Sequence, residues 1–473
     1  MILPVVGSTQ AEAMCFFEDI SIKHLNKYRP SESWRKTLMF FSQTVPSVRH
    51  AATAVALIHR NYLDRHTNNR TYQAPPLKDR LPDKAPLVHY NRAIQLLLNP
   101  ENAHGDSPEI TAVTLLVCYL FTCFDHLVGD DDQAMKHLSG GVALSRSIEN
   151  ATLNNCNYDD ALSSGAHSII SQVTKQIRRL DMQAVMFLVD WTPANIQETF
   201  TTHLAFFDSA FCSMDQAADH LQVLIAQVMR LLFNTEEQTS PTDMMTPSSS
   251  SLTDIVLGQL DTWSFLFENL LQLGSPSESD FQNDDDEPLI SLLRLQHIIA
   301  WTLLSGYDGP DGEMDYDNFL PQFQQGIALA DKVSAAHQRY SGLSRSTFTP
   351  EIGFIPVLYI IGVKCRHPIV RREVLRILRR QLIREAVWDS ISTARVIEWV
   401  IEIEEAGHIR VHGEEAQVIQ CMEQIPVWQR IEALSYTYVP VGQSATRLDI
   451  TYTFCSREGV HTESLMVQQT LDS

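Results

Sequence analysis

Two aspartate-rich runs come closer than other parts of this sequence to a metal-binding pattern. The first is Asp130–Asp132, and the second begins the stretch NDDDEPLIS at 283–291. Helical enzymes that hold a diphosphate through magnesium place one aspartate cluster opposite a second Asn/Asp–Ser–Glu cluster. The second run has Glu287 where a Ser or Thr is required, and Ser291 where a Glu is required. We therefore predict no magnesium site, and we expect Asp130–Asp132 to place negative charge at a helix N-terminus.

Histidines and nucleophile motifs give no catalytic constellation. His50 could be paired with His59, and His126 with His137, but the chain has 17 His and such pairings arise by chance. The sequence has no H-E-x-x-H, no G-x-S-x-G, no Walker loop and no G-x-G-x-x-G. We predict that the protein is not an enzyme, with no catalytic residue and no cofactor.

The cysteines carry no zinc pattern. There are 8 Cys in the chain, and no two of them stand in C-x2-C spacing, which zinc sites normally use. Their scatter also differs from the disulfide framework of a small secreted domain. We therefore predict reduced thiols and no metal-ligating residue.

The segment 364–384 is strongly basic although the chain as a whole is acidic. It contains eight Lys or Arg and a single acid, Glu373, whereas the whole chain has a formal net charge of −21. On a helical wheel over 368–384, the apolar side chains share one face and the arginines share another. The apolar face comprises Val374, Leu375, Leu378 and Leu382, and the basic face comprises Arg372, Arg376, Arg379 and Arg380.

Three roles for this basic face are open. The arginines could form ion pairs with the acidic helix predicted at 391–405, they could bind a protein partner, or they could contact nucleic acid. Phosphate binding needs a positive field, and a chain with a pI near 5.2 provides a negative one on average. We favour ion pairing within the chain, through Glu398, Glu402, Glu404 and Glu405. The four arginines remain the candidate partner surface, and direct nucleic-acid contact is not expected.

Composition and periodicity predict an all-α protein. Hydrophobic residues make up 44% of the 473 residues and Gly is scarce, while apolar positions recur at helical spacing. We predict one large helical regulatory domain over 1–430, and a C-terminal strand segment and tail over 431–473. Residues 433–441 and 447–455 alternate apolar and polar side chains and predict a β-hairpin. The polar stretches near 234–251 and 274–288 predict disordered loops.

The expected helices follow from apolar spacing, N-caps and proline positions. They cover residues 11–25, 31–43, 46–63, 88–99, 107–129, 130–148, 172–190, 199–233, 252–273, 289–304, 316–338, 353–364, 368–384 and 391–405. The N-terminus lacks the basic region of a signal peptide, and no window has about 18 uninterrupted apolar residues. We expect no association with a membrane.

Several stretches of the chain resemble one family of proteins. Two of them lie towards the C-terminus: FTPEIGFIPVLYIIGVKCRHPIVRREVLRILRR at 348–380 and EAVWDSISTARVIEWVIEIEE at 385–405. Three lie in the N-terminal half: VPSVRHAATAVALIHRNY at 45–62, LVHYNRAIQLLL at 87–98 and LLVCYLFTCFDHLVGDDDQAMKHLSGGVALSRS at 115–147. Together they resemble the regulatory domain of fungal binuclear zinc cluster transcription factors, in particular the regulators typified by those of the aspercryptin cluster.

The resemblance does not extend to the DNA-binding module of that family. The module uses six cysteines, in two C-x2-C-x6-C units separated by a loop, to place a short helix in the major groove. These 473 residues lack that pattern. We therefore expect either a regulator that has lost its zinc cluster or a gene model that lacks an upstream exon.

The resemblance implies a role in transcription regulation, controlling a fungal secondary-metabolite gene cluster through protein partners. Such a partner would be a zinc-cluster transcription factor or a second copy of the chain. It also implies a nuclear location, with the cytoplasm as the location if no partner imports the chain. The alternatives left open are an all-α enzyme of a biosynthetic cluster and a helical scaffold unrelated to transcription.

Overall fold

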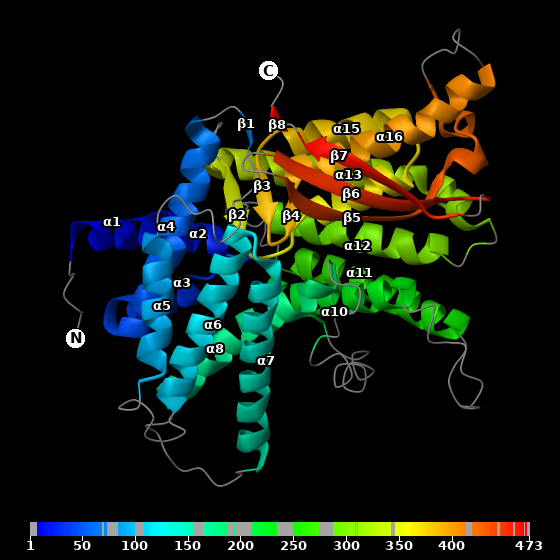
Figure 1. Ribbon diagram of the computed structural model, residues 1–473. Helices are drawn as coiled ribbons and strands as arrows, with labels where there is room; N and C mark the ends of the chain where they lie inside the picture. Colours follow the sequence, from blue (N-terminus) through cyan, green and yellow to red (C-terminus); the bar gives the residue numbers. More distant parts are fainter. Residues whose placement is uncertain are drawn as a thin grey trace.

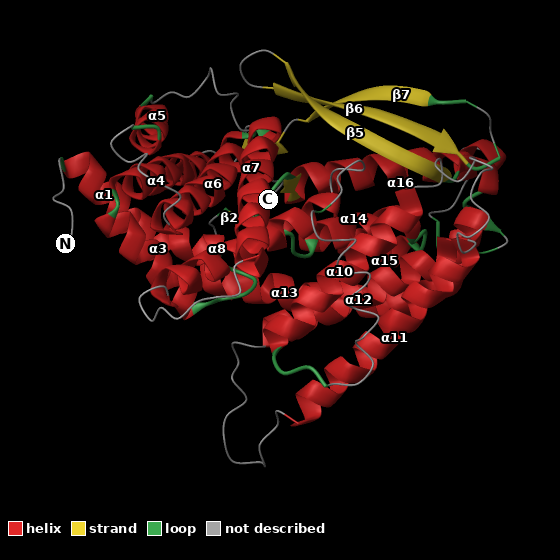
Figure 2. Cartoon of the chain, turned by 90° about the horizontal axis from the view of Figure 1, so that it is seen from below, coloured by secondary structure: helices red, strands yellow, loops and turns green. Residues whose placement is uncertain are grey.

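The computed structural model is predominantly helical, which confirms the predicted all-α class (Figure 1). The sheets are small, and the largest lies near the C-terminus (Figure 2). The structure describes residues 7–68, 71–72, 84–99, 108–154, 164–186, 193, 210–233, 249–273, 287–307, 309, 311–341, 346–412, 419–441, 445–456, 459–467 and 469–470.

The N-terminal helices enclose one hydrophobic core. Its elements are α1 (Ser8–Phe16), the π-helix η1 (Phe17–Ser21), α2 (Ile22–Leu25), α3 (Glu32–Thr44), α4 (Pro46–Asn68), α5 (Ala85–Leu97), α6 (Pro108–Val128), α7 (Asp131–Asn154) and α8 (Ser164–Gln183). Helix α6 is apolar nearly all round, and Leu115, Leu116 and Leu120 are fully buried in this core. A helix without a polar face has to be surrounded by others, so its central place follows from its sequence.

The later helices enclose a second core. They are η4 (Ala184–Met186), α10 (Met214–Phe233), α11 (Ser249–Leu273), α12 (Glu287–Tyr307), η7 (Gly312–Phe319), α13 (Leu320–Ser341), α14 (Ile355–Lys364), α15 (Pro368–Arg379) and α16 (Ser390–His412). The described residues of the predicted helical domain therefore form two large hydrophobic clusters, one on each side of the view in Figure 1.

A three-stranded antiparallel sheet covers α16. Its strands are β5 (Ile431–Val441), β6 (Ala445–Phe454) and β7 (His461–Val467). The pairing of β5 with β6 confirms the predicted hairpin, whereas β7 was not predicted. Trp399 and Val400 of α16 pack with Leu448 and Ile450 of β6 in a third small core. Figure 2 shows the sheet as a layer on the outside of the helices.

The predicted helix over 368–384 is wrong at its C-terminal end. Helix α15 stops at Arg379, and Ile383–Glu385 forms strand β3. Strand β3 pairs in parallel with β2 (Thr347–Thr349) and antiparallel with β4 (Trp388–Asp389). Strand β2 is distant from β3 in the sequence, and β4 reaches β3 only through a turn. Helical periodicity contains no signal for either pairing. A further short antiparallel pair joins β1 (Thr71–Tyr72), which follows α4, to β8 (Gln469–Thr470), near the C-terminus.

The two predicted disordered loops fall largely outside the described residues. Of the loop at 234–251, residues 249–251 belong to α11, and of the loop at 274–288, residues 287–288 belong to α12. The helix expected over 199–233 is described from Met214, as α10, and residues 199–209 lie outside the described part.

Two described helices are long and apolar enough to cross a membrane by length and composition alone. They are Glu109–Val128 in α6 and Glu287–Tyr307 in α12, and 72% and 61% of their most apolar windows are buried inside the protein. Burial to this extent is what the central helices of a packed core require.

A buried carboxylate connects the segment after α2 to the start of α14. Glu385 accepts hydrogen bonds from the backbone N–H groups of Gly353 at 2.9 Å, Phe354 at 3.2 Å and Ile355 at 3.1 Å, at the start of α14. The hydroxyl of Tyr28, from the segment after α2, donates to the same side chain. Burial raises the pKa of Glu385 to about 7, although these four donors favour its charged form.

Candidate functional site

Helices α15 and α16 lie side by side and run antiparallel. Arg372, near the start of α15, pairs with Glu405, late in α16, whereas Arg379, at the end of α15, pairs with Glu398, earlier in α16. This arrangement confirms that the basic and acidic helices predicted at this place are neighbours. Figure 1 shows both helices at the top of the view, next to the C-terminal sheet.

Each arginine of the candidate partner surface has a carboxylate partner within the chain. Arg372 makes a two-pronged contact with Glu405 at 2.8 and 2.9 Å, and Arg379 lies 2.8 Å from Glu398. Arg376 bridges Glu373 of its own helix and Asp331 of α13, both at 2.7 Å. Arg380 also binds Asp331, through both the carboxylate and the backbone carbonyl.

These groups form a mixed-charge surface over α13, α15 and α16. Its members are Arg372, Arg376, Arg379, Arg380, Arg395, Asp331, Glu373, Glu398, Glu402 and Glu405. Five arginines face five carboxylates, so the net charge of the surface is zero. Such a surface offers paired donors and acceptors to a protein partner, and it lacks the positive field that a nucleic-acid backbone needs.

A second set of charges, from α15, from the turn before it and from α16, is fully buried. Arg371, Arg366 and Glu404 each have 0% of their side chain exposed. Arg371 donates to one carboxylate oxygen of Glu404, and Arg366 lies 3.4 Å from the other. Arg371 also donates to the backbone carbonyls of Gly362 and Val363 at 3.1 and 3.3 Å.

This buried ion network, defined by Arg366, Arg371 and Glu404, connects α14–α16 to the sheet. Glu404 accepts from the backbone N–H of Ile431, and Arg366 donates to the backbone carbonyl of the same residue, both at 2.8 Å. Ile431 is the first residue of β5, so the network holds the sheet where it begins. Arg366 also donates to Glu313 of η7 at 2.9 Å.

The arginines determine the charge state of Glu404. Burial alone would raise its pKa, but the attraction of Arg371 and Arg366 and the bond from Ile431 lower it below 4.5. The pKa of Arg366 is raised, because the attraction of Glu404 and Glu313 outweighs its burial. Glu404 and Arg366 are therefore both charged at neutral pH.

The sequence grouped Glu404 with Glu398, Glu402 and Glu405 as ion-pair partners of the basic helix, and gave no indication that Glu404 would be buried. Arg371 was not among the predicted site residues. The spacing does contain the signal. Arg371 lies three and seven residues before the buried Val374 and Leu378, and therefore shares their face. An arginine on the apolar stripe of one helix predicts an acid on the apolar stripe of its neighbour.

The aspartate run 130–132 has the structural role predicted for it. Asp130 accepts from the backbone N–H of Gln133 at 3.2 Å, as an N-cap of α7 does. Asp131 contacts Nδ1 of His126 at 2.9 Å. Within the described residues, no group of three or more His, Cys, Asp or Glu is placed to hold a metal ion.

His50 and His59 do not pair with each other. His59 instead lies between the hydroxyl of Ser21, 3.0 Å from its Nδ1, and Nδ1 of His24, 3.2 Å from its Nε2. Ser21 and His59 are fully buried, so solvent and substrate cannot reach this chain of hydrogen bonds. Burial lowers the pKa of His24 to about 3 and that of His59 well below 6.5, and both rings are neutral at pH 7.

His50 and His137 each contact another side chain. His50 lies 2.8 Å from His89, and His137 lies 2.6 Å from the hydroxyl of Tyr90. The cysteines that the structure describes are free thiols, of which Cys123 and Cys365 are buried and Cys15 and Cys212 are exposed.

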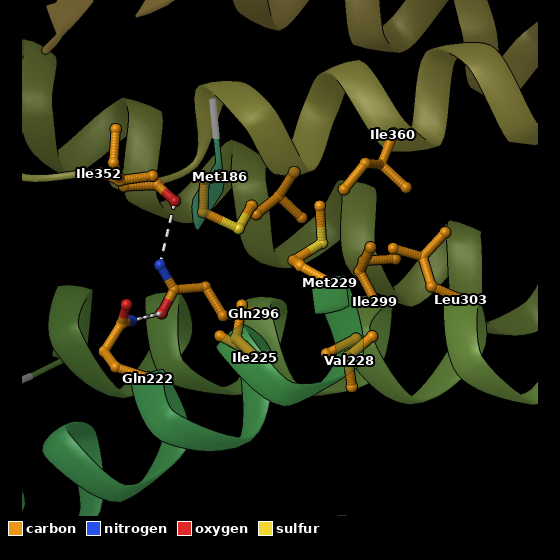
Figure 3. Close-up of a pocket in the computed structure, with 13 residues that line it drawn as sticks. Met186, Gln222, Ile225, Val228, Met229, Gln296, Ile299, Leu303, Ile352 and Ile360 are labelled. Atoms are coloured by element: carbon orange, nitrogen blue, oxygen red, sulfur yellow. Dashed lines mark hydrogen bonds between the residues drawn. The ribbon is translucent and has the colours of Figure 1, made fainter. Parts of the chain in front are cut away.

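A small internal cavity lies between α10, α12 and the loop before α14 (Figure 3). Its volume is about 20 Å³, which suffices for a water molecule but not for a metabolite. Most of its lining is aliphatic, and Gln296 crosses one end, accepting from Gln222 at 3.2 Å and donating to the carbonyl of Gly353 at 3.1 Å. The amide groups are satisfied by each other and by the backbone, which is how buried polar groups are normally accommodated.

Comparison with known proteins identifies no relative. No family model, no curated protein and no solved structure matches this chain.

Proposed function

We propose that the chain is a transcription regulator-like protein that acts through protein partners, without a DNA-binding zinc cluster within these residues. The fungal setting, the control of a secondary-metabolite cluster and the nuclear location belong to this proposal. The proposed partner is a zinc-cluster transcription factor or a second copy of the chain.

One observation carries the proposal. The stretches that resemble the zinc-cluster regulators contribute buried residues to both cores, and two of them meet in the N-terminal core. Phe348, from the C-terminal stretch, packs in the N-terminal core, and its ring centroid lies 6.2 Å from that of His59 in the stretch 45–62. The resemblance therefore covers residues that depend on one another in the fold, which is the pattern expected of a shared domain.

The electrostatics of the candidate site support partner binding over contact with DNA. The arginines that the sequence offers for phosphate binding are each paired with a carboxylate. An ion pair at a surface contributes only about 0–1 kcal/mol, so a protein partner could exchange these pairs at little cost.

A tethering experiment tests the proposal. The full chain is fused to an unrelated DNA-binding domain and directed to a reporter promoter in a fungal host, with the DNA-binding domain alone as the control. We expect a severalfold change in reporter transcription. A fusion that is expressed and bound at the promoter, yet leaves transcription unchanged, would support the helical-scaffold alternative. Magnesium-dependent binding of a diphosphate by the purified chain would support the enzyme alternative.

A further inference from the structure

An open groove runs along the outer side of α11, where this helix lies against α12. Figures 1 and 2 both place α11 at the margin of the second helical core. The groove has a volume of about 420 Å³. It is lined by Asp261, Phe265 and Glu268 of α11 and by His297, Ile298 and Trp301 of α12. Phe265 is 65% exposed, which is a large exposed area for an aromatic side chain.

The exposed stripe of α11 repeats every seven residues. Asp254, Asp261 and Glu268 follow one another at that interval, and they therefore lie in a row along the helix, about 10 Å apart. Gly258 and Phe265 lie between them on the same stripe, each four residues after an acid. A seven-residue repeat is the spacing that a second helix matches when it packs lengthwise against the first.

The charge of the groove is negative. Glu268 is bound by Arg294 of α12 in a two-pronged contact at 2.8 and 3.0 Å. Burial lowers the pKa of His297, so this ring does not offset the nearby Asp261 carboxylate at pH 7. Among the described residues, no cation lies within ion-pair distance of Asp261. The groove therefore combines an aromatic wall with an uncompensated carboxylate.

We propose that this groove docks a basic amphipathic helix of a partner protein. Lys or Arg side chains of the partner, repeated every seven residues, lie against Asp254 and Asp261, and a large apolar side chain enters between Phe265 and Trp301. Gly258 presents no side chain, and the space in front of it is open, so the partner backbone can approach closely there. A second copy of this chain would set the same acidic stripe against itself, so the charges disfavour self-association.

The inference does not depend on a role in transcription, and its test measures binding rather than gene expression. The probe is a fluorescent synthetic helix of about three heptads, with Lys at every seventh position and Leu between. A matched peptide has Glu in place of Lys. The full-length chain is titrated with each peptide at low and moderate salt, because a basic peptide is also attracted nonspecifically to an acidic protein.

Two variants and two matched controls assign the binding to the groove. We expect Phe265→Ala to weaken binding of the Lys peptide by about thirtyfold, and Asp261→Lys to weaken it at least as much. The controls Phe40→Ala, at an exposed Phe of α3, and Asp64→Lys, at an exposed Asp of α4, should bind as the parent does. All four changes are at exposed positions, and thermal unfolding checks that each variant is folded.

The outcomes are distinguishable. Equal losses in the groove variants and the controls would mean nonspecific attraction, and would overturn the proposal, as would equal binding of the Glu peptide. A photo-crosslinking aromatic residue at position 265 then identifies the occupant in cells. A crosslink to a basic helix that is lost with Asp261→Lys supports the proposal, and a crosslink to a second copy of the chain overturns it.

Discussion

The two faces of α15 carry the same residue types in opposite environments. Arg371 and Glu404 form a fully buried pair, and their immediate neighbours Arg372 and Glu405 form a pair at the surface, in which the side chains are 46% and 22% exposed. Both pairs join α15 to α16, and the two residues of each pair are 33 positions apart. The chain therefore contains a natural control for the effect of burial on an ion pair.

The two pairs differ in how much the stability of the fold depends on them. A buried charge that loses its partner remains away from water, and breaking such a pair costs about 3–5 kcal/mol. An exposed charge that loses its partner is hydrated again, and the cost is about 0–1 kcal/mol. The buried ion network thus belongs to the fold, whereas the mixed-charge surface remains available for binding.

The largest effect is expected for Glu404→Gln. The substitution removes the negative charge that faces the buried Arg371 and Arg366, and leaves one acceptor oxygen where the carboxylate offered two to Arg371, Arg366 and the backbone N–H of Ile431. We expect the free energy of unfolding to fall by about 3–5 kcal/mol in a urea titration. Glu405→Gln, one residue away, is the matched control, and an equal loss in both variants would remove the distinction.

Substitution of the buried Arg371 should destabilise the fold more than substitution of the exposed Arg372. Arg371→Met should cost about 3 kcal/mol in the free energy of unfolding, since Glu404 keeps Arg366 as a partner. Arg372→Met should cost less than about 1 kcal/mol. Methionine preserves most of the apolar stem, so the comparison isolates the charge. A cost for Arg372→Met as large as that for Arg371→Met would contradict the account.

The pH dependence of stability distinguishes Glu404 from a second buried glutamate, Glu385. Glu404 has a pKa below 4.5, so the stability it contributes is present above about pH 4.5 and is lost as the pH falls through its folded pKa. Glu385 is also fully buried, but no arginine is among the main influences on its pKa, which is raised to about 7. Its contribution is present below about pH 4.5 and is lost as the pH rises through about 7.

Glu385→Gln should therefore remove a loss of about 2–3 kcal/mol that the parent chain shows between about pH 5 and pH 8. Glu404→Gln should instead flatten the acid limb of the stability curve. Buried histidines such as His24 also shape the curve of stability against pH. Because their pKa is lowered, they make stability fall as the pH drops, which is opposite to the effect of Glu385. Each variant is therefore compared with the parent over the whole pH range. A Glu385→Gln curve parallel to that of the parent would contradict this assignment.

The smallest effect concerns salt. The contribution of Arg379 with Glu398 should weaken in about 1 M salt, because the Debye length shortens to about 3 Å and both side chains are partly exposed. The effect of Arg379→Ala on the unfolding midpoint should then be close to zero. The effect of Arg371→Met should persist in salt, because ions do not reach a fully buried pair. Equal salt sensitivity of the two variants would show that the buried ion network is hydrated.

Helical periodicity predicted the elements of this fold well where burial follows a single helix face. Val374 and Leu378 were placed correctly on the inner face of α15, and both are buried. Periodicity failed for β3, because the pairing of Ile383 with Thr347 depends on contacts between distant segments. The sequence indicated that the basic and acidic helices would pair.

It did not show which charges would be buried, since hydropathy assigns every arginine and glutamate to the surface. Arg371 could have been recognised from its place on the apolar stripe. The groove beside α11 could not have been, because it depends on how α12 packs against that helix.

The central claim is that burial, and not residue type, separates the two faces of α15. Two double-mutant cycles, Arg371→Met with Glu404→Gln and Arg372→Met with Glu405→Gln, measure it most directly through urea unfolding. The account predicts a coupling energy of at least about 2 kcal/mol for the buried pair and below about 0.5 kcal/mol for the surface pair. Equal coupling energies in the two cycles would contradict it.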